Sequence, residues 1–109
     1  MQQTYVIQDR KVQKDGLGGQ IEAWADFLTV RGYLDLQSGT DRQPGQNAIV
    51  EGSTHVLIIP KHIPAITADH RVKDPESGRI YAITYADDPV GIHHHTELYL
   101  QYQDGEQDG

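Results

Sequence analysis

The sequence lacks cysteine, has few basic residues and contains no long apolar run, and each shortage excludes a class of protein. Without cysteine there is no disulfide framework, no thiol nucleophile and no Cys-ligated zinc or iron–sulfur site. The longest unbroken apolar run, from Val56 to Ile59, is far shorter than the ~20 residues of a membrane helix. The first residues show neither the basic nor the apolar region of a secretory signal. We therefore expect synthesis in a cytoplasm and no membrane partner.

Basic residues are outnumbered, with 9 Lys and Arg against 16 Asp and Glu and a formal net charge of −7. A nucleic-acid-binding protein normally presents a basic face, because neutralisation of phosphates supplies most of the affinity. Here the basic residues are scattered apart from one short run, Arg10–Lys11. The composition argues against tight DNA binding and against an oligonucleotide-binding barrel. It suits an acidic surface past which DNA moves without adhering.

The 109 residues predict a single domain, residues 1–109, of the all-β class. The 11 glycines and 5 prolines are spread along the chain and leave few stretches of helical length. Residues 28–37 and 91–103 alternate apolar and polar side chains, which is the period of a strand with one buried face. Further strands are expected at residues 4–8, 56–59 and 79–85, and a strand with a bulge at 20–27, separated by turns at 15–19, 74–78 and 87–91. The turn at 74–78 predicts a hairpin, and the whole pattern predicts a small antiparallel barrel or sandwich.

Residues 38–53 do not fit this strand pattern. The segment is rich in polar residues and contains three glycines and one proline, and it is longer than the ~12–15 residues that an unstructured loop in a compact domain normally reaches. Such loops are functional or disordered. One interpretation is a mobile surface loop at about residues 38–54, and the other is a segment that orders against a partner through the apolar Ile49 and Val50.

The histidine-rich segment after residue 92 is the strongest candidate for chemistry. On a continuous strand, His93, His95 and Glu97 project to one side, as a metal-binding triad of a β-barrel enzyme would. The spacing differs from the cupin pattern, in which the Glu comes later and another His follows. The alternatives are histidines that hydrogen-bond along a sheet face, or a contact between subunits. Tyr33 and Tyr99, which are predicted to face outward, would join His93, His95 and Glu97 in such a protein interface.

No catalytic arrangement stands out from the rest of the sequence. Ser38, Ser53 and Ser77 lack the Gly-x-Ser-x-Gly context of an activated serine, and residues 15–19 lack the Lys-Ser/Thr of a phosphate-binding loop. We therefore predict a protein that is not an enzyme and that has no cofactor and no bound metal. The metal-binding enzyme is the second hypothesis.

An ordered series of short motifs resembles the head–tail joining proteins of long-tailed phages, also called head-closure or stopper proteins. The series consists of Trp24, Tyr33-Leu34-Asp35-Leu36, Ser38-Gly39, Ser53-Thr54-His55, Asp69-His70-Arg71-Val72, Gly78-Arg79-Ile80-Tyr81-Ala82-Ile83, Asp87-Asp88-Pro89 and His94-His95-x-Glu97-Leu98-x-Leu100. It covers most of the chain, and the stoppers of siphophages of Gram-positive bacteria are the most similar group.

The resemblance implies a structural protein of the virion rather than an enzyme. Members form a small β-barrel and assemble as a homo-oligomeric ring beneath the portal and adaptor rings. The ring closes the exit of the capsid after DNA packaging, retains the double-stranded DNA without reading its sequence, and later receives the tail. A long loop of each subunit gates the channel. By position, the gating loop of this chain consists of Gly39, Thr40, Asp41, Arg42, Gln43, Pro44, Gly45, Gln46, Asn47, Ala48, Ile49, Val50, Glu51, Gly52 and Ser53.

Overall fold

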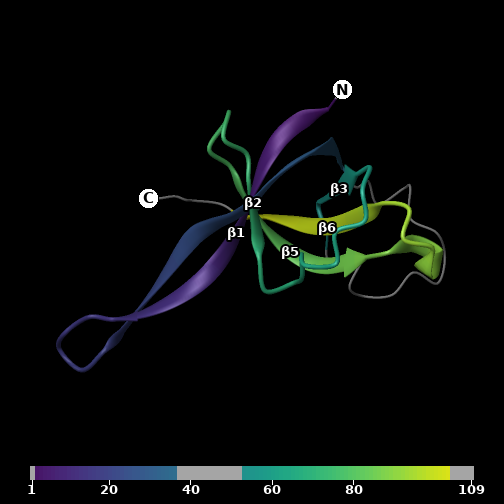
Figure 1. Cartoon of the computed structure of the whole chain (residues 1–109). Helices are drawn as coiled ribbons and strands as arrows, with labels where there is room; N and C mark the ends of the chain where they lie inside the picture. The colour runs from purple at the N-terminus through teal and green to yellow at the C-terminus, as the bar shows by residue number, and fades with distance from the viewer. Residues whose placement is uncertain (1, 37–52, 104–109) are drawn as a thin grey trace.

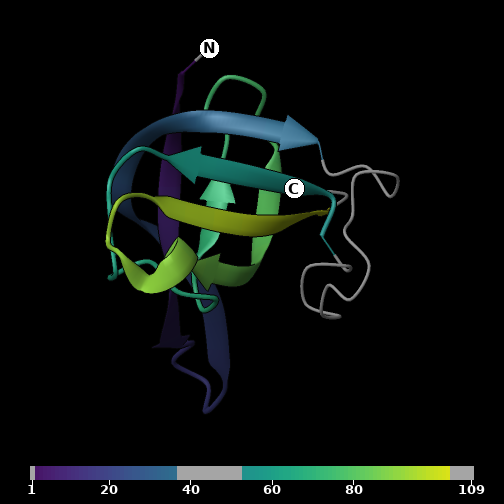
Figure 2. The ribbon, with the colours of Figure 1, turned by 90° about the vertical axis from the view of Figure 1, so that its right-hand side faces the viewer.

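The computed structural model describes residues 2–36 and 53–103, which form a closed barrel of six antiparallel strands. The strands are β1 (Gln3–Lys14), β2 (Gln20–Leu36), β3 (His55–Ile59), β4 (Arg71–Lys73), β5 (Ile80–Asp87) and β6 (Thr96–Gln103). Their order around the barrel is β1-β2-β3-β6-β5-β4, and β4 pairs back with β1 (Figures 1 and 2). The all-β prediction is confirmed, and of its two forms the structure adopts the barrel.

Alternating side chains fill the interior of the barrel, as the sequence pattern predicts. The buried core comprises Tyr5, Ile7, Val30, Leu57, Ile59, Ile66, Val72, Tyr81, Ile83, Leu98 and Leu100. Within residues 28–37, Leu28 and Leu34 pack against this core on either side of the buried Val30. Leu36 is an exception. It is the last residue of β2, lies outside the core cluster and has 71% of its surface exposed.

The predicted bulge in residues 20–27 is confirmed and lies at the end of that range. Ile7 of β1 pairs with Leu28, but the next residue, Gln8, pairs with Asp26, so Phe27 has no partner in the ladder. A bulge bends a strand and increases its twist. The ring of Phe27 stacks on that of His70, with centroids 4.6 Å apart.

Beyond the bulge, β1 and β2 continue as a two-stranded ribbon, here called the arm (residues 9–26). β4 pairs only with residues 6–8 of β1, and β3 pairs only with residues 33–36 of β2, so the strands of the arm pair only with each other. Figure 1 shows the arm leading away from the barrel, on the side opposite β3 and β6. The molecule is accordingly elongated, with principal extents of 50 × 26 × 26 Å.

The two predicted turns at 15–19 and 74–78 are confirmed. At the tip of the arm, the Asp15 carboxylate accepts the N–H groups of Leu17 and Gly19 at 2.8 and 2.9 Å. These hydrogen bonds, donated by the backbone, hold the pKa of Asp15 below its ordinary value. Between β4 and β5, Gly78 has a φ of +80°, a conformation that costs glycine nothing, and its N–H donates to the Asp74 carbonyl.

The strand predicted at 91–103 begins later than the alternation suggests. Pro89–Gly91 form a 3₁₀ turn, η2, and β6 starts at Thr96. Val90 and His93 both adopt the left-handed region, with φ of 60° and 59°. The chain therefore reverses direction before the strand, and His93 cannot share a strand face with His95 and Glu97.

Candidate functional site

Four of the five predicted interface residues lie on one side of the barrel. Tyr33 of β2 is in register with Ile58 of β3, Ile58 with Glu97 of β6, and Glu97 with Asp87 of β5. Residues directly opposite on neighbouring strands face the same way. Tyr33, which is 41% exposed, and Glu97 therefore belong to one outer surface, and Tyr99 follows two positions along β6.

A chain of hydrogen bonds runs along this outer surface. The Tyr99 hydroxyl donates to Glu97 Oε1 at 2.8 Å, His95 Nε2 lies 3.0 Å from Glu97 Oε2, and His95 Nδ1 lies 3.0 Å from Nδ1 of His94. Burial of the phenol, and then its hydrogen bond to Glu97, raise the pKa of Tyr99. Both carboxylate oxygens of Glu97 are thus engaged by protein groups, and the surface is polar but ordered.

His93 lies apart from this surface and belongs to a different group. Its ring Nδ1 is 2.6 Å from Asp88 Oδ2, and its backbone N–H donates to Asp88 Oδ1 at 2.9 Å. His62, from the connection between β3 and β4, approaches the same Asp88 Oδ2 at 3.9 Å. The fold therefore does not place His93 on one face with His95 and Glu97, as the metal-binding alternative requires. The structure instead assembles His62, Asp88 and His93.

The charges and contacts around Asp88 favour its ionised form. Partial burial by itself raises the pKa of the carboxyl. The hydrogen bonds from the His93 backbone and ring, and the charges of His93 and His62, outweigh that effect and lower the pKa overall. Sequence reasoning treated His62 as isolated, because only the closed barrel brings the connection after β3 next to the one after β5.

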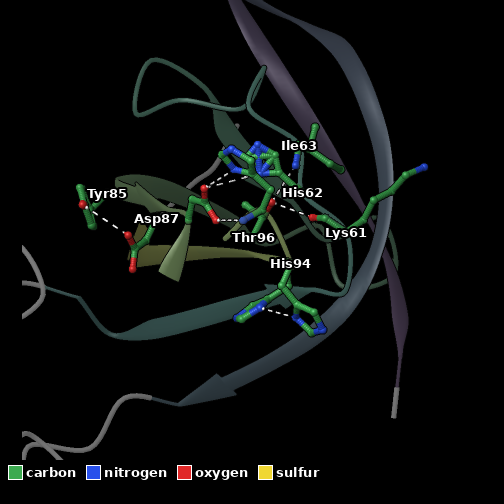
Figure 3. A network of polar contacts seen from close by, with 10 residues as sticks. Lys61, His62, Ile63, Tyr85, Asp87, His94 and Thr96 are labelled. Atoms are coloured by element: carbon green, nitrogen blue, oxygen red, sulfur yellow. Dashed lines mark hydrogen bonds and ion pairs between the residues drawn. The ribbon is translucent and has the colours of Figure 1, made fainter. Parts of the chain in front are cut away.

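The hydroxyl of Thr96 fixes the segment that carries His62. This hydroxyl is buried, accepts the Ile63 N–H at 2.9 Å and donates to the Lys61 carbonyl at 2.7 Å. Figure 3 shows Thr96 between these two backbone groups, with His62 between Lys61 and Ile63. One buried side chain of β6 therefore holds both neighbours of His62 in place.

The root of the arm is a second polar site, and sequence reasoning missed it. Gln8 is buried; its Nε2 donates to Asp26 at 3.0 Å and its Oε1 accepts from Arg71 Nε at 2.7 Å. The Arg71 guanidinium also lies 4.4 Å from the centre of the Trp24 ring. These contacts join the arm to β4, so the arm is braced at its base.

Apolar side chains lie exposed farther out on the arm. Val12, Ile21 and Leu17 are 60%, 51% and 92% exposed, with Leu17 in the turn at the tip. Both outer edges of the arm leave backbone N–H and C=O groups without a strand partner among the described residues. Exposed edges and apolar side chains together are features of a surface that contacts another protein.

The predicted gating loop lies outside the described residues, except for Ser53. Ser53 is buried, and its hydroxyl is 2.8 Å from that of Thr84, which donates to the Tyr99 carbonyl. The adjacent Thr54 donates its N–H to the Leu100 carbonyl at 2.7 Å. The last residue of the predicted loop is therefore a fixed anchor on the barrel.

Comparisons with known proteins identify one family and two similar folds. The sequence matches the family described as phage head completion protein over residues 1–101. The fold is similar to the solution structure of protein SF1141 from Shigella flexneri 2a, with a TM-score of 0.70, 23% identity and coverage of 93% of this chain and 91% of that one. It is also similar to a chain of the virion of a native gene transfer agent particle, with a TM-score of 0.63, 16% identity and coverage of 93% and 94%. No curated protein matches the sequence.

In the part of the chain that the structure describes, no helix has the length and apolar character needed to cross a membrane.

The match to the phage head completion protein family covers nearly the whole sequence and confirms the resemblance at the level of the family. The protein is accordingly a virion component with a structural role in the head–tail connector. This chain belongs to the phage head completion protein family.

Proposed function

We propose that copies of this protein assemble into a ring at the junction of head and tail. The ring closes the channel through which DNA was packaged, contacts the portal and adaptor proteins on one side and presents a docking surface for the tail on the other. The sequence motifs resemble those of the stoppers of siphophages of Gram-positive bacteria, and this resemblance supports the proposed arrangement of ring, portal and tail.

The exposed surface of the arm is the observation that supports assembly into a ring. An isolated two-stranded ribbon is only marginally stable in water, and this one exposes Val12, Leu17 and Ile21. Val12 pairs with Glu22 and Ile21 with Gln13, so the two side chains face opposite sides of the ribbon. Packing between neighbouring copies on both sides of the arm would cover them. A contact between the arm of one copy and a different surface of the next is heterologous, and such contacts close into rings when the rotation between copies is suitable. The braced root at Gln8 and Arg71 would hold the arm at a constant angle to the barrel.

We assign the gating role to residues 39–53 of each copy. The anchor at Ser53 and the end of β2 at Leu36 place the two flanks of this segment on neighbouring strands of the barrel, β2 and β3. In a ring, neighbouring copies of the segment would meet at the axis, where Ile49 and Val50 supply apolar contacts and backbone groups pair between subunits. The net charge of −7 suits a channel to which DNA does not adhere.

The outer surface with Tyr33, His95, Glu97 and Tyr99 is the proposed contact with other proteins of the particle. Hydrogen bonds hold His95, Glu97 and Tyr99 in fixed positions before any partner binds, which lowers the entropy cost of association. We propose no catalytic role. The enzyme hypothesis required His93, His95 and Glu97 on one face, and the fold separates His93 from the other two.

A deletion of residues 46–50 tests the gate. Phage heads filled with DNA are completed with the deletion protein, with the unaltered protein, or with a control in which the same five positions carry Gly and Ser. Release of DNA is followed by its sensitivity to nuclease. We expect particles that contain the deletion protein to leak their DNA. Sealed particles with a normal content of the deletion protein would contradict the gating role.

A further inference from the structure

His62, Asp88 and His93 have the composition and the geometry of a metal-binding site. One donor atom from each residue lies within 4.8 Å of the other two. The two imidazole Nδ1 atoms lie 3.9 and 2.6 Å from the same oxygen, Asp88 Oδ2. Ligand atoms around a tetrahedral zinc ion, at about 2.0–2.1 Å from the metal, are about 3.3 Å apart. The observed distances fall on either side of this value, so small side-chain rotations would complete the site.

The His62 ring carries an unsatisfied nitrogen that faces this group. Among the described residues, Nδ1 of His62 is a buried side-chain nitrogen without a hydrogen-bond partner, and its distance of 3.9 Å to Asp88 exceeds a hydrogen bond. A buried polar atom without a partner is costly, and most such atoms in folded proteins have one. A metal ion bound to Nδ1 would satisfy it.

The surrounding structure holds all three side chains in position. Asp88 Oδ1 is occupied by the backbone N–H of His93, which leaves Oδ2 to face the two rings. The left-handed conformation of His93, with φ of 59°, turns its ring back over Asp88. Thr96 fixes the backbone on both sides of His62. Such supporting hydrogen bonds around the ligands typically set the affinity of metal sites.

We propose that His62, Asp88 and His93 bind a divalent transition-metal ion such as Zn²⁺, with water in the remaining position. Two imidazoles and one carboxylate favour zinc, nickel, cobalt or copper over magnesium and calcium, which take oxygen ligands. The ion would link the connection after β3 to the connection after β5, two segments that otherwise meet through side chains. The proposal rests on this geometry and is independent of the ring.

Titration of the purified protein with Zn²⁺ by calorimetry, and with Co²⁺ followed by its visible absorption, tests the site. We expect one ion per chain, a tetrahedral Co²⁺ spectrum and a higher melting temperature with Zn²⁺. His62→Gln, Asp88→Asn and His93→Asn should each weaken binding about tenfold or more. Asn at position 93 tolerates the left-handed backbone, so this variant keeps the local fold.

The double variant His94→Gln/His95→Gln is the matched control, because it removes two neighbouring histidines outside the site. It should bind Zn²⁺ with unchanged affinity. Circular dichroism of each variant confirms that the barrel is folded. The absence of stoichiometric binding by the unaltered protein would overturn the proposal. Binding that survives His62→Gln but is lost in the control would do the same, because the ion would then be held by His94 and His95.

Discussion

Gly32 of β2 lies against the backbone of Ile58 of β3, and a Cβ on residue 32 would come within 2.6 Å of the Ile58 carbonyl oxygen. The same position would bring that Cβ to 3.1 Å from the Leu57 side chain. Since the obstacle is backbone, the strands themselves would have to separate. The close approach lies next to Tyr33, where the pairing of β2 with β3 begins.

Gly32→Ala should therefore lower the free energy of unfolding by about 1–3 kcal/mol, the range expected for overpacking a tight core position. Urea denaturation followed by Trp24 fluorescence measures the change. Thr29→Ala, at an exposed position on the same strand, is the control and should alter stability by less than about 0.5 kcal/mol. Equal effects of the two variants would show that the contact is not tight.

Thr96→Val should destabilise the barrel by about 2 kcal/mol, because it leaves the Ile63 N–H and the Lys61 carbonyl without their partner. The local effect is measured by hydrogen exchange of the Ile63 amide, which should be faster in the valine variant than in the unaltered protein. Thr96→Ser keeps the hydroxyl and should retain slow exchange. If the valine variant protected the Ile63 amide as well as threonine does, the bridging role of the hydroxyl would be refuted.

Arg71→Met should loosen the arm without unfolding the barrel. The change removes the hydrogen bond to Gln8 and the cation over the Trp24 ring while keeping most of the apolar stem. We expect faster hydrogen exchange in residues 9–14 and 20–26 and altered Trp24 fluorescence.

Arg10→Met is the control for the arm, because Arg10 pairs with Glu22 at 3.2 Å where both side chains are more than half exposed. Exposed ion pairs contribute little, about 0–1 kcal/mol. Exchange rates in the arm that respond equally to both variants would argue against a braced root.

Stability should fall as the pH drops, in part through His55. Burial, and then the positive charge of Arg79, lower the pKa of His55 below its ordinary value of about 6.5. The unfolded chain therefore takes up the proton at a higher pH than the folded chain. The stability contributed by neutral His55 is present above about pH 6.5 and is lost as the pH falls through the lower folded pKa.

Urea denaturation of the unaltered protein and of His55→Gln between about pH 8 and pH 5 measures this contribution. The slope of stability against pH should be smaller in the variant. Arg79→Met should also reduce the slope, because it removes the second cause of the shift. A slope that is the same in all three proteins would show that His55 titrates alike in the folded and unfolded chains.

Local periodicity predicted the strands but not where they stop pairing. Leu28, Val30 and Leu34 face the core as their alternation indicates, since one face of a strand is decided by nearest neighbours in the sequence. Val12 and Ile21 also lie within strands and yet are exposed on the arm. Their environment depends on how far β3 and β4 extend, which local sequence does not contain.

The candidate sites also depend in part on contacts that local sequence does not predict. The alternation in the sequence continues back to Gly91 and so predicts that His93 lies on a strand. In the structure, Gly91 and His93 both have a positive φ, 67° and 59°, and belong to a reversal of the chain. His62 joins Asp88 and His93 only through the closure of the barrel. By contrast, Tyr33, Glu97 and Tyr99 lie within regular strands, and period two alone predicts that each side chain points outward. Only the register through Ile58 of β3 places Tyr33 and Glu97 on one surface.

The most direct test of the proposed function is a density map of the assembled head–tail junction. We predict a closed ring of this protein in which each arm packs on the neighbouring copy and residues 39–53 of all copies converge on the channel axis below the DNA. A ring in which these residues lie on the outer circumference, or in which the arms contact no neighbour, would contradict it.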